Sequence, residues 1–429
     1  MISFFKRITP TGLIVLWVLT RLWALGCGMK VLPYPTGEYL FSDVQLYDWW
    51  SSNIADGHFP INDPMWQYPP LAALVFYVGY CLHSATIGFV VLALIADGLT
   101  LGVLIRASKR QQLGHYLPAA IWLLAPLVMG PIILGRFDVF PTLLMVVALL
   151  ASQQPVRAGF WLAIGTLLKV WPILGLLALK RSALPKAMIS FIATSVAGSL
   201  LLKLWWPGSF SFIDGQKSRG LQIESVGALP YMWWNATSHI VTTDFRFGAI
   251  EVVARGTSVV SFAITLCTIV LLGRISIWRL QGRFENVSAP DVALVTVLIA
   301  MVTSRVLSPQ YNVWIFGILA VCAVNPGQHF ERITQLFFIG ALAGQFLYPF
   351  AYVSFQSGEV LPTIAQTIRI GTLLAATYLA WQQIKPRPAH LDRDHPATPG
   401  VAQLTVPKSS YSAPKHDQQG RIARIIAGH

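Results

Sequence analysis

Apolar runs recur along most of this chain, from about residue 11 to residue 384. Several are long enough for a helix of about 20 residues, the length that spans the hydrocarbon core of a membrane. Only 11% of the 429 residues are charged and 55% are apolar, whereas an ordinary soluble domain has about 25% charged residues. A soluble globule of this size could not bury so much apolar surface. The sequence therefore predicts an all-α, polytopic membrane protein.

We expect about 12 membrane helices from these runs. The runs are 11–29, 69–83, 86–105, 117–134, 138–152, 158–179, 187–204, 250–273, 291–307, 310–324, 333–350 and 365–384. The number of crossings between residues 69 and 180 stays open, because the basic residues at 106–110 indicate an interior loop that a simple count puts outside. One solution makes 69–105 a single crossing with a re-entrant or surface piece, and breaks 158–179 into a hairpin at Lys169.

The distribution of charge predicts which loops face outward. Segment 31–68 contains five acidic residues and no Lys or Arg, as expected of an exported loop. The loops 180–186 and 274–283 are basic and should lie inside, so the long segment 205–248 between them should lie outside. The protein should therefore have two large exterior loops and sit in the cell membrane, with both termini in the cytoplasm.

The net charge of +13 is spread over short loops and the C-terminal segment. Without a basic recognition helix or an aromatic RNA-binding pattern, this charge indicates contact with anionic membrane lipids and no nucleic-acid partner. We expect residues 1–384 to form the transmembrane domain and 385–429 a disordered basic cytoplasmic tail, because that last segment is too polar to bury a core.

One carboxylate of the first exterior loop stands out. Residues 41–50 resemble a short amphipathic helix, in which Asp43 and Tyr47 are four residues apart and share a face. If this helix lies on the membrane through Trp49 and Trp50, Asp43 occupies a partly dry site suited to a general base. The alternative is that Asp43 only caps the N-terminus of the helix.

Three cations are candidates for binding an anionic group. Arg136 and Asp138 lie between two apolar runs with almost no loop, so they must pair with one another or face water, unless Arg136 binds phosphate. Lys169 lies inside an apolar run and either snorkels or is held in a cavity by an anion. Arg305 lies at the predicted outer end of a span, where it either anchors the helix at the interface or binds a lipid phosphate.

The chain carries no recognisable nucleotide-binding loop, zinc-protease helix or serine-hydrolase elbow. Nucleotide sugars and ATP are cytoplasmic, whereas the acidic residues are expected outside. An enzyme of this kind would therefore need a lipid-borne activated substrate, such as a polyprenyl-phosphate sugar. The alternative is a transporter or lipid flippase of envelope precursors, if the acids and Lys169 line a path across the membrane.

Five short motifs occur in a familiar order over about residues 10–384. They are Asp43-Val44-Gln45-Leu46-Tyr47, Gln67-Tyr68-Pro69-Pro70-Leu71, Gly135-Arg136-Phe137-Asp138, Leu168-Lys169-Val170-Trp171-Pro172 and Ser308-Pro309-Gln310-Tyr311. Together they resemble the GT-C fold polyprenol-phosphate-mannose-dependent alpha-mannosyltransferases of bacteria, which include the phosphatidylinositol mannoside and lipomannan enzymes of actinobacteria.

The resemblance implies a GT-C type enzyme that moves mannose, with inversion, from a polyprenyl-phosphate donor to a glycolipid or glycan acceptor at the outer face of the membrane. Asp43 would be the general base, and Arg136, Lys169 and Arg305 would balance the donor phosphate without a metal or other cofactor. The implied substrate-binding residues are Tyr47, Gln67, Tyr68, Asp138, Gln310 and Tyr311. Mannolipid-forming members carry a histidine after the Ser-Pro pair, where this chain has Gln310, Tyr311 and Asn312, so the resemblance leaves the acceptor open.

Overall fold

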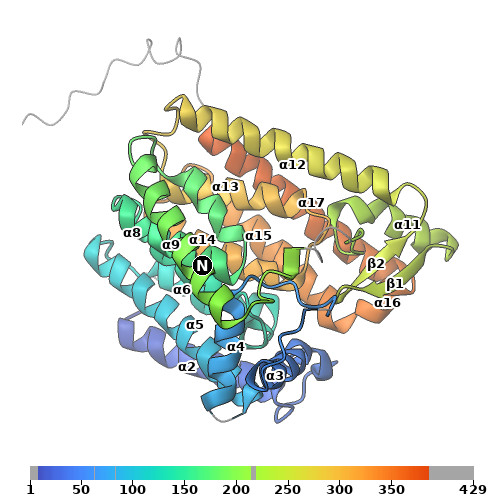
Figure 1. Cartoon of the computed structure of the whole chain (residues 1–429). Coiled ribbons are helices and arrows are strands. Elements are labelled where there is room, and N and C mark those ends of the chain that lie inside the picture. The colour runs from blue at the N-terminus through green and yellow to red at the C-terminus, as the bar shows by residue number, and fades with distance from the viewer. Residues whose placement is uncertain (1–7, 62, 83, 214–218, 386–429) are drawn as a thin grey trace, which may run out of the picture. The chain divides into compact units, whose positions relative to one another are not determined.

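The computed structural model describes residues 8–61, 63–82, 84–213 and 219–385, and these are mostly helical (Figure 1). Six helices are long and apolar enough to cross a membrane: α2 (Pro10–Gly28), α5 (Ala85–Arg110), α9 (Leu184–Trp205), α12 (Thr257–Leu280), α15 (Phe330–Gln345) with the π-helical turn η6 (Phe346–Phe350), and α17 (Val360–Ile384). The prediction of a helical, polytopic membrane protein is confirmed. The predicted tail, apart from Lys385, lies outside the described residues.

Six shorter apolar helices pack among the long ones: α4 (Leu71–Leu82), α6 (Leu117–Met129), α7 (Val139–Leu150), α8 (Pro155–Leu168), α13 (Ala289–Val302) and α14 (Asn312–Cys322). The remaining helices are α3 (Ser42–Ala55), α11 (Leu229–Ser238), α16 (Tyr352–Gln356) and the 3-10 helices η1 (Gly37–Tyr39), η2 (Ile133–Gly135), η3 (Trp171–Ala178), η4 (Val226–Ala228) and η5 (Pro309–Tyr311). Most of the shorter apolar helices are too short to span a bilayer alone, since a helix rises about 1.5 Å per residue.

A two-stranded antiparallel hairpin, β1 (Thr242–Arg246) and β2 (Ala249–Val253), was not predicted. Its turn is Phe247-Gly248, and both residues have positive φ, 50° and 73°, as tight hairpin turns require. The strand takes up the first residues of the predicted span 250–273, so that span was placed too early. Helix α12 begins only at Thr257.

Local sequence signals set several helix boundaries. Helix α4 begins at Leu71, directly after the two prolines that exclude helix before it. In α2, the Thr9 hydroxyl accepts a hydrogen bond of 3.1 Å from the backbone N–H of Gly12, an N-cap that satisfies one of the first free amides. Helix α6 stops before Gly130, whose φ of 85° favours glycine.

The chain reverses direction at Lys169, in agreement with the hairpin expected there. Helix α8 ends at Leu168 and Lys169 is extended, after which η3 returns along α8. Gly175 packs against Leu162, and Gly165 packs against Pro172, so the two pieces run antiparallel. Residues 158–179 therefore enter and leave from the same end of the helical bundle.

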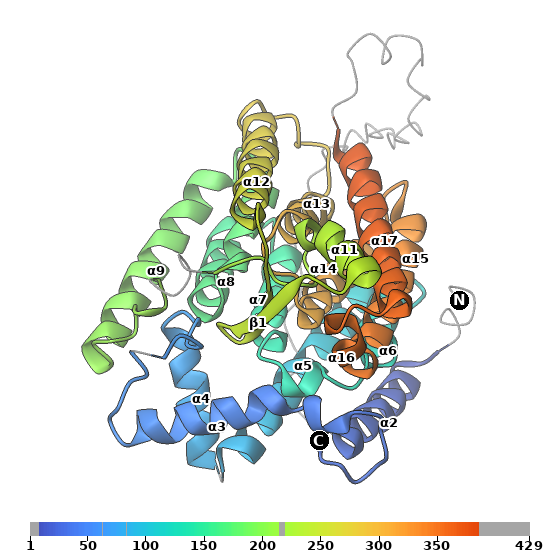
Figure 2. The ribbon, with the colours of Figure 1, turned by 90° about the vertical axis from the view of Figure 1, so that its right-hand side faces the viewer.

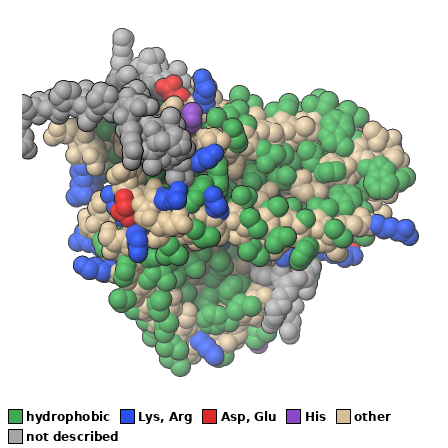
Figure 3. Space-filling model, turned by 90° about the horizontal axis from the view of Figure 1, so that it is seen from above, with side chains coloured by type: hydrophobic (Ala, Val, Ile, Leu, Met, Phe, Trp, Pro, Cys, Tyr) green, Lys and Arg blue, Asp and Glu red, His purple; other side chains and the backbone are tan. Residues whose placement is uncertain are grey.

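The basic loops gather at that end. The first turn of α8 packs beside the start of α9, where the Ser190 hydroxyl donates a hydrogen bond of 2.8 Å to the carbonyl of Val156. At the end of α12, the Arg279 guanidinium donates to the carbonyl of Lys180 over 3.1 Å. Figure 3 shows Lys and Arg side chains concentrated toward one side of a largely apolar face. Figure 2 faces the opposite end, where β1, α11 and α16 lie.

A buried ion pair joins three of the helices. The Arg21 guanidinium on α2 makes two contacts of 2.8 Å with the Asp97 carboxylate on α5, and donates to the carbonyl of Leu123 on α6 over 3.0 Å. Both side chains are almost completely buried. In a membrane such charges need a partner, so this pair fixes how α2 packs.

Candidate functional site

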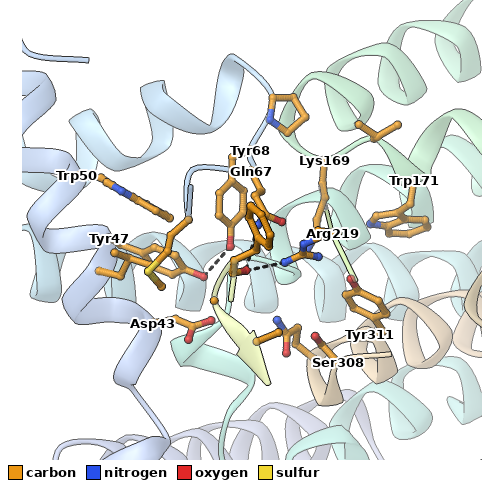
Figure 4. A pocket seen from close by; sticks show the side chains of 18 of the residues that line it. Asp43, Tyr47, Trp50, Gln67, Tyr68, Lys169, Trp171, Arg219, Ser308 and Tyr311 are labelled. Carbon is orange, nitrogen blue, oxygen red and sulfur yellow. Dashed lines mark hydrogen bonds between the residues drawn. The ribbon is translucent and has the colours of Figure 1, made fainter. Parts of the chain in front are cut away.

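A cavity of about 400 Å³ opens where several distant segments meet. Its walls come from α3, the segment before α4, the turn after α8, the β1–β2 hairpin and the segment around η5 (Figure 4). Seven of the residues predicted for the site line it: Asp43, Tyr47, Gln67, Tyr68, Lys169, Gln310 and Tyr311. Three do not: Arg136, Asp138 and Arg305.

Helix α3 presents Asp43 and Tyr47 on one face, as their spacing predicted. The prediction that this helix lies on the membrane through both Trp49 and Trp50 is wrong in part. Trp49 is 52% exposed, but Trp50 is 1% exposed and its indole N–H donates to the Asp63 carboxylate over 2.6 Å. Trp50 lies one turn beyond Tyr47 and so shares its buried face. Only Trp49 is free to meet a membrane.

Asp43 pairs with Arg136 rather than capping its helix. No side-chain cap closes the start of α3, and the Asp43 carboxylate, whose side chain is 30% exposed, forms an ion pair with the Arg136 guanidinium. Arg136 also donates to the Tyr348 hydroxyl over 2.7 Å. Gly135 permits this approach, because a side chain there would collide with Phe41 and the Leu40 carbonyl. Arg136 is therefore a partner of Asp43, and it is almost fully buried.

Lys169 is held by an anion, as one of its two interpretations required. Its ammonium contacts Asp138 Oδ1 over 2.7 Å, and the Trp314 indole N–H donates to the same oxygen over 2.6 Å. The Lys169 ammonium also lies 5.8, 5.4 and 5.5 Å from the ring centres of Tyr68, Tyr311 and Trp314, within range of cation–π attraction. Asp138 is 1% exposed and acts behind the cavity wall.

The expectation that Arg136 and Asp138 pair with one another or face water is wrong. Each pairs with a segment far away in the sequence, Arg136 with Asp43 and Asp138 with Lys169. Two residues of a single short segment therefore hold the carboxylate and the ammonium that line the cavity.

Arg305 lies behind another cation, Arg219. The Arg305 guanidinium donates to the Arg219 carbonyl over 2.9 Å. Arg219 itself lines the cavity and donates to the carbonyl of Phe247 over 2.9 Å, an oxygen that Gln67 also contacts, at 3.0 Å. The Nε of Arg219 is buried without a hydrogen-bond partner among the described residues. Sequence reasoning gave Arg219 no role, because nothing marks one arginine of a long loop as facing a cavity.

Tyr47, which is buried, and Tyr68, which is half-buried, complete the wall beside Asp43. The hydroxyls of Tyr47 and Tyr68 lie 3.0 Å apart. Burial raises the pKa of Tyr68 to about 12, and burial raises the pKa of Tyr47 well above its ordinary value. Both phenols are therefore neutral at physiological pH and act as hydrogen-bonding groups. Among the described residues, no group of three or more His, Cys, Asp and Glu side chains is placed to hold a metal ion.

Residues 66–309, more than half of the chain, match the family model of Glycosyltransferase family 87. The chain belongs to Glycosyltransferase family 87. The segment that places this chain in family 87 includes Lys169, Asp138 and Arg219, and it begins after Asp43. A search of curated proteins finds no match.

Membership of Glycosyltransferase family 87 confirms the expectation of a membrane glycosyltransferase, which has a sugar donor and an acceptor. It does not favour the alternative of a transporter or lipid flippase. Asp43, Lys169 and Arg219 line the cavity and supply a carboxylate and two cations that such an enzyme can use for catalysis.

Proposed function

We propose that this glycosyltransferase moves mannose from a polyprenyl-phosphate donor to a glycolipid or glycan acceptor, with inversion at the anomeric carbon. The observation that carries the proposal is that Asp43 and Lys169 line different sides of one cavity, with Gln67, Tyr68 and Arg219 between them (Figure 4). A single displacement needs this arrangement, with a base for the incoming hydroxyl and a cation for the departing phosphate.

Asp43 is the proposed general base. Its carboxylate takes the proton of the acceptor hydroxyl while that oxygen forms a bond to the anomeric carbon. The bond between this carbon and the phosphate oxygen breaks, and its electron pair leaves with the polyprenyl phosphate. Arg136, which also donates a hydrogen bond to the Tyr348 hydroxyl, orients the carboxylate from behind. A mechanism with one carboxylate as base and no covalent sugar intermediate inverts the configuration.

Lys169 and Arg219 are the proposed ligands of the donor phosphate, because both line the cavity. Asp138 positions Lys169 and Arg305 positions the Arg219 segment. The substrate contacts that remain are assigned to Tyr47, Gln67, Tyr68, Gln310 and Tyr311. Arg136, which the resemblance assigned to phosphate, is instead engaged by Asp43.

We further propose that the six long and six shorter helices form a GT-C type transmembrane domain of about 12 membrane helices, with residues 385–429 as a cytoplasmic tail. The cavity would face the exterior of the cell membrane. Support comes from the basic loops, which gather at the end of the bundle away from Asp43, where the positive-inside rule expects the cytoplasm.

The test is Asp43→Asn in proteoliposomes that contain radiolabelled polyprenyl-phosphate mannose. Lipids extracted from a strain that lacks the enzyme serve as acceptors. We expect transfer to fall by at least about 10²-fold, the contribution of a positioned general base. Asp48→Asn, at an exposed position of the same helix, is the control and should stay active. Full activity of Asp43→Asn would remove the assigned base, and transfer from a nucleotide sugar alone would remove the assigned donor.

A further inference from the structure

A second cavity, of about 410 Å³, lies between the end of α5, the end of α7 and the start of α8. Three arginines line it, Arg106 and Arg110 from α5 and Arg157 from α8. Arg106 and Arg110 are four residues apart, so they share one helix face. The Arg157 guanidinium donates to the Gln154 side-chain carbonyl over 2.6 Å, which holds it at the cavity.

This cavity lies at the opposite end of the bundle from the candidate active site. Helix α7 begins beside Asp138 and ends at Leu150, which lines the second cavity. Helix α8 runs the other way, from this cavity to Lys169. Helices of this length separate the two sites by about 20 Å, since each residue adds about 1.5 Å.

The positive charge of the second cavity is not balanced by the described part of the chain. No Asp or Glu lines the cavity, and the three arginines form no salt bridge with any described carboxylate. Like charges that share a cavity repel one another and attract an anion. The arginine fork fits phosphate oxygens in particular.

Apart from Gln111 and Gln154, the remaining wall is apolar. Val103 and Val147 line it, together with Leu150 and Val324, and Trp161 is half-buried at its side. A soluble phosphate has no apolar part that could contact such a wall, whereas a phospholipid has glycerol and acyl carbons next to its phosphate. The cavity lies at the end of α5, a helix long and apolar enough to cross a membrane, and therefore at the depth of lipid headgroups.

We propose that this cavity binds the headgroup of an anionic glycerophospholipid from the leaflet at the basic end of the bundle. The three arginines bind the phosphate, and the apolar wall accepts the adjoining carbons. Basic pockets between membrane helices are known to suit such headgroups. The site is separate from sugar transfer and does not depend on the identity of the donor.

The test uses the full-length protein in detergent and native mass spectrometry with phosphatidylglycerol or phosphatidylcholine added. We expect the wild type to retain phosphatidylglycerol in preference to phosphatidylcholine. The double variant Arg106→Gln, Arg157→Gln should weaken that retention by about fivefold for each arginine, the contribution of one basic residue near a lipid surface. Lys109→Gln is the matched control, because Lys109 is exposed on the same helix end but lies outside the cavity.

Equal retention of the two lipids by the wild type would overturn the proposal. So would a loss in Lys109→Gln as large as that in the double variant, because retention would then reflect general surface charge. Displacement of phosphatidylglycerol by millimolar inorganic phosphate would assign the cavity to a soluble anion instead. A melting curve of each variant, recorded without added lipid, separates loss of binding from loss of folding.

Discussion

The two cavities have nearly the same volume, about 400 and 410 Å³. They differ in whether their positive side chains are paired with carboxylates. Beside the first cavity, Arg136 is paired with Asp43 and Lys169 with Asp138. In the second, three arginines have no described carboxylate within reach. Of the two cations that line the first cavity, Lys169 and Arg219, only Arg219 lacks an ion pair with a described carboxylate. Such a site holds a resting phosphate weakly and is well suited to charge that develops during a reaction. A site with unbalanced positive charge attracts an anion without any reaction.

Breaking the Lys169–Asp138 pair should have the largest effect. Lys169→Met leaves a buried carboxylate without its cation, which costs about 3–5 kcal/mol of stability, and removes the proposed phosphate ligand, which costs about 10²–10³-fold in turnover. Thermal unfolding in detergent and transfer per folded molecule measure the two losses separately.

Lys203→Met is the control for the Lys169 variant, since Lys203 is exposed on α9. The Lys169→Met, Asp138→Leu double variant should recover stability, because no buried charge is left, but it should remain inactive. Recovery of activity in the double variant would show that Lys169 is only structural.

Removal of the Asp43 carboxylate should make the first cavity resemble the second. Asp43→Asn releases Arg136 from its ion pair and adds one net positive charge beside the cavity. We expect polyprenyl phosphate, the leaving group, to bind about tenfold more tightly, because a hydrogen bond to a charged group such as the released Arg136 is worth about 1.5 kcal/mol. Competition binding with labelled polyprenyl phosphate measures this. Weaker binding in Asp43→Asn would mean that the Arg136 guanidinium does not reach the cavity.

The sequence predicted the residues of the first cavity better than their partners. Asp43, Tyr47 and Lys169 could be recognised because they interrupt apolar patterns or share a helix face. The pairings of Arg136 with Asp43 and of Lys169 with Asp138 could not, because ion pairs between distant segments depend on tertiary packing that a single sequence does not encode locally.

The sequence likewise predicted some features of the fold and missed others. Apolar runs predicted the helices, although α4 begins only after the two prolines that the predicted run 69–83 included. The β1–β2 hairpin was missed because its second strand is short and apolar, and therefore looked like the start of the following span. The buried Arg21–Asp97 pair was missed because isolated charges in long apolar runs carry little weight in a count of spans.

A carboxylate introduced into the second cavity should make it resemble the first. Gln154→Glu changes little in shape and places a negative charge against Arg157, which already donates to this side chain. We expect retention of phosphatidylglycerol to fall by about fivefold, the value of one basic residue near a lipid surface. Native mass spectrometry measures it, with Gln153→Glu, an exposed neighbour outside the cavity, as the control. Unchanged retention would contradict the role of unbalanced charge.

An equally small effect is expected from the uncharged hydroxyl groups beside the first cavity. Tyr68→Phe removes one hydroxyl, 3.0 Å from that of Tyr47, and a neutral hydrogen bond of this kind is worth about 1 kcal/mol. Transfer should therefore fall by only about fivefold, far less than after loss of Lys169.

The pH dependence of transfer by wild type and Tyr68→Phe tests whether the Tyr68 hydroxyl stays neutral. Because burial raises the pKa of Tyr68 to about 12, the phenol keeps its proton at every pH below that value, and its charge does not change between pH 6 and pH 10. The profiles of wild type and Tyr68→Phe should thus have the same shape over this range and differ only in height. A limb of the wild-type profile near pH 10 that the variant lacks would show that Tyr68 ionises. The first cavity would then depend on a third acid beside the carboxyl groups of Asp43 and Asp138.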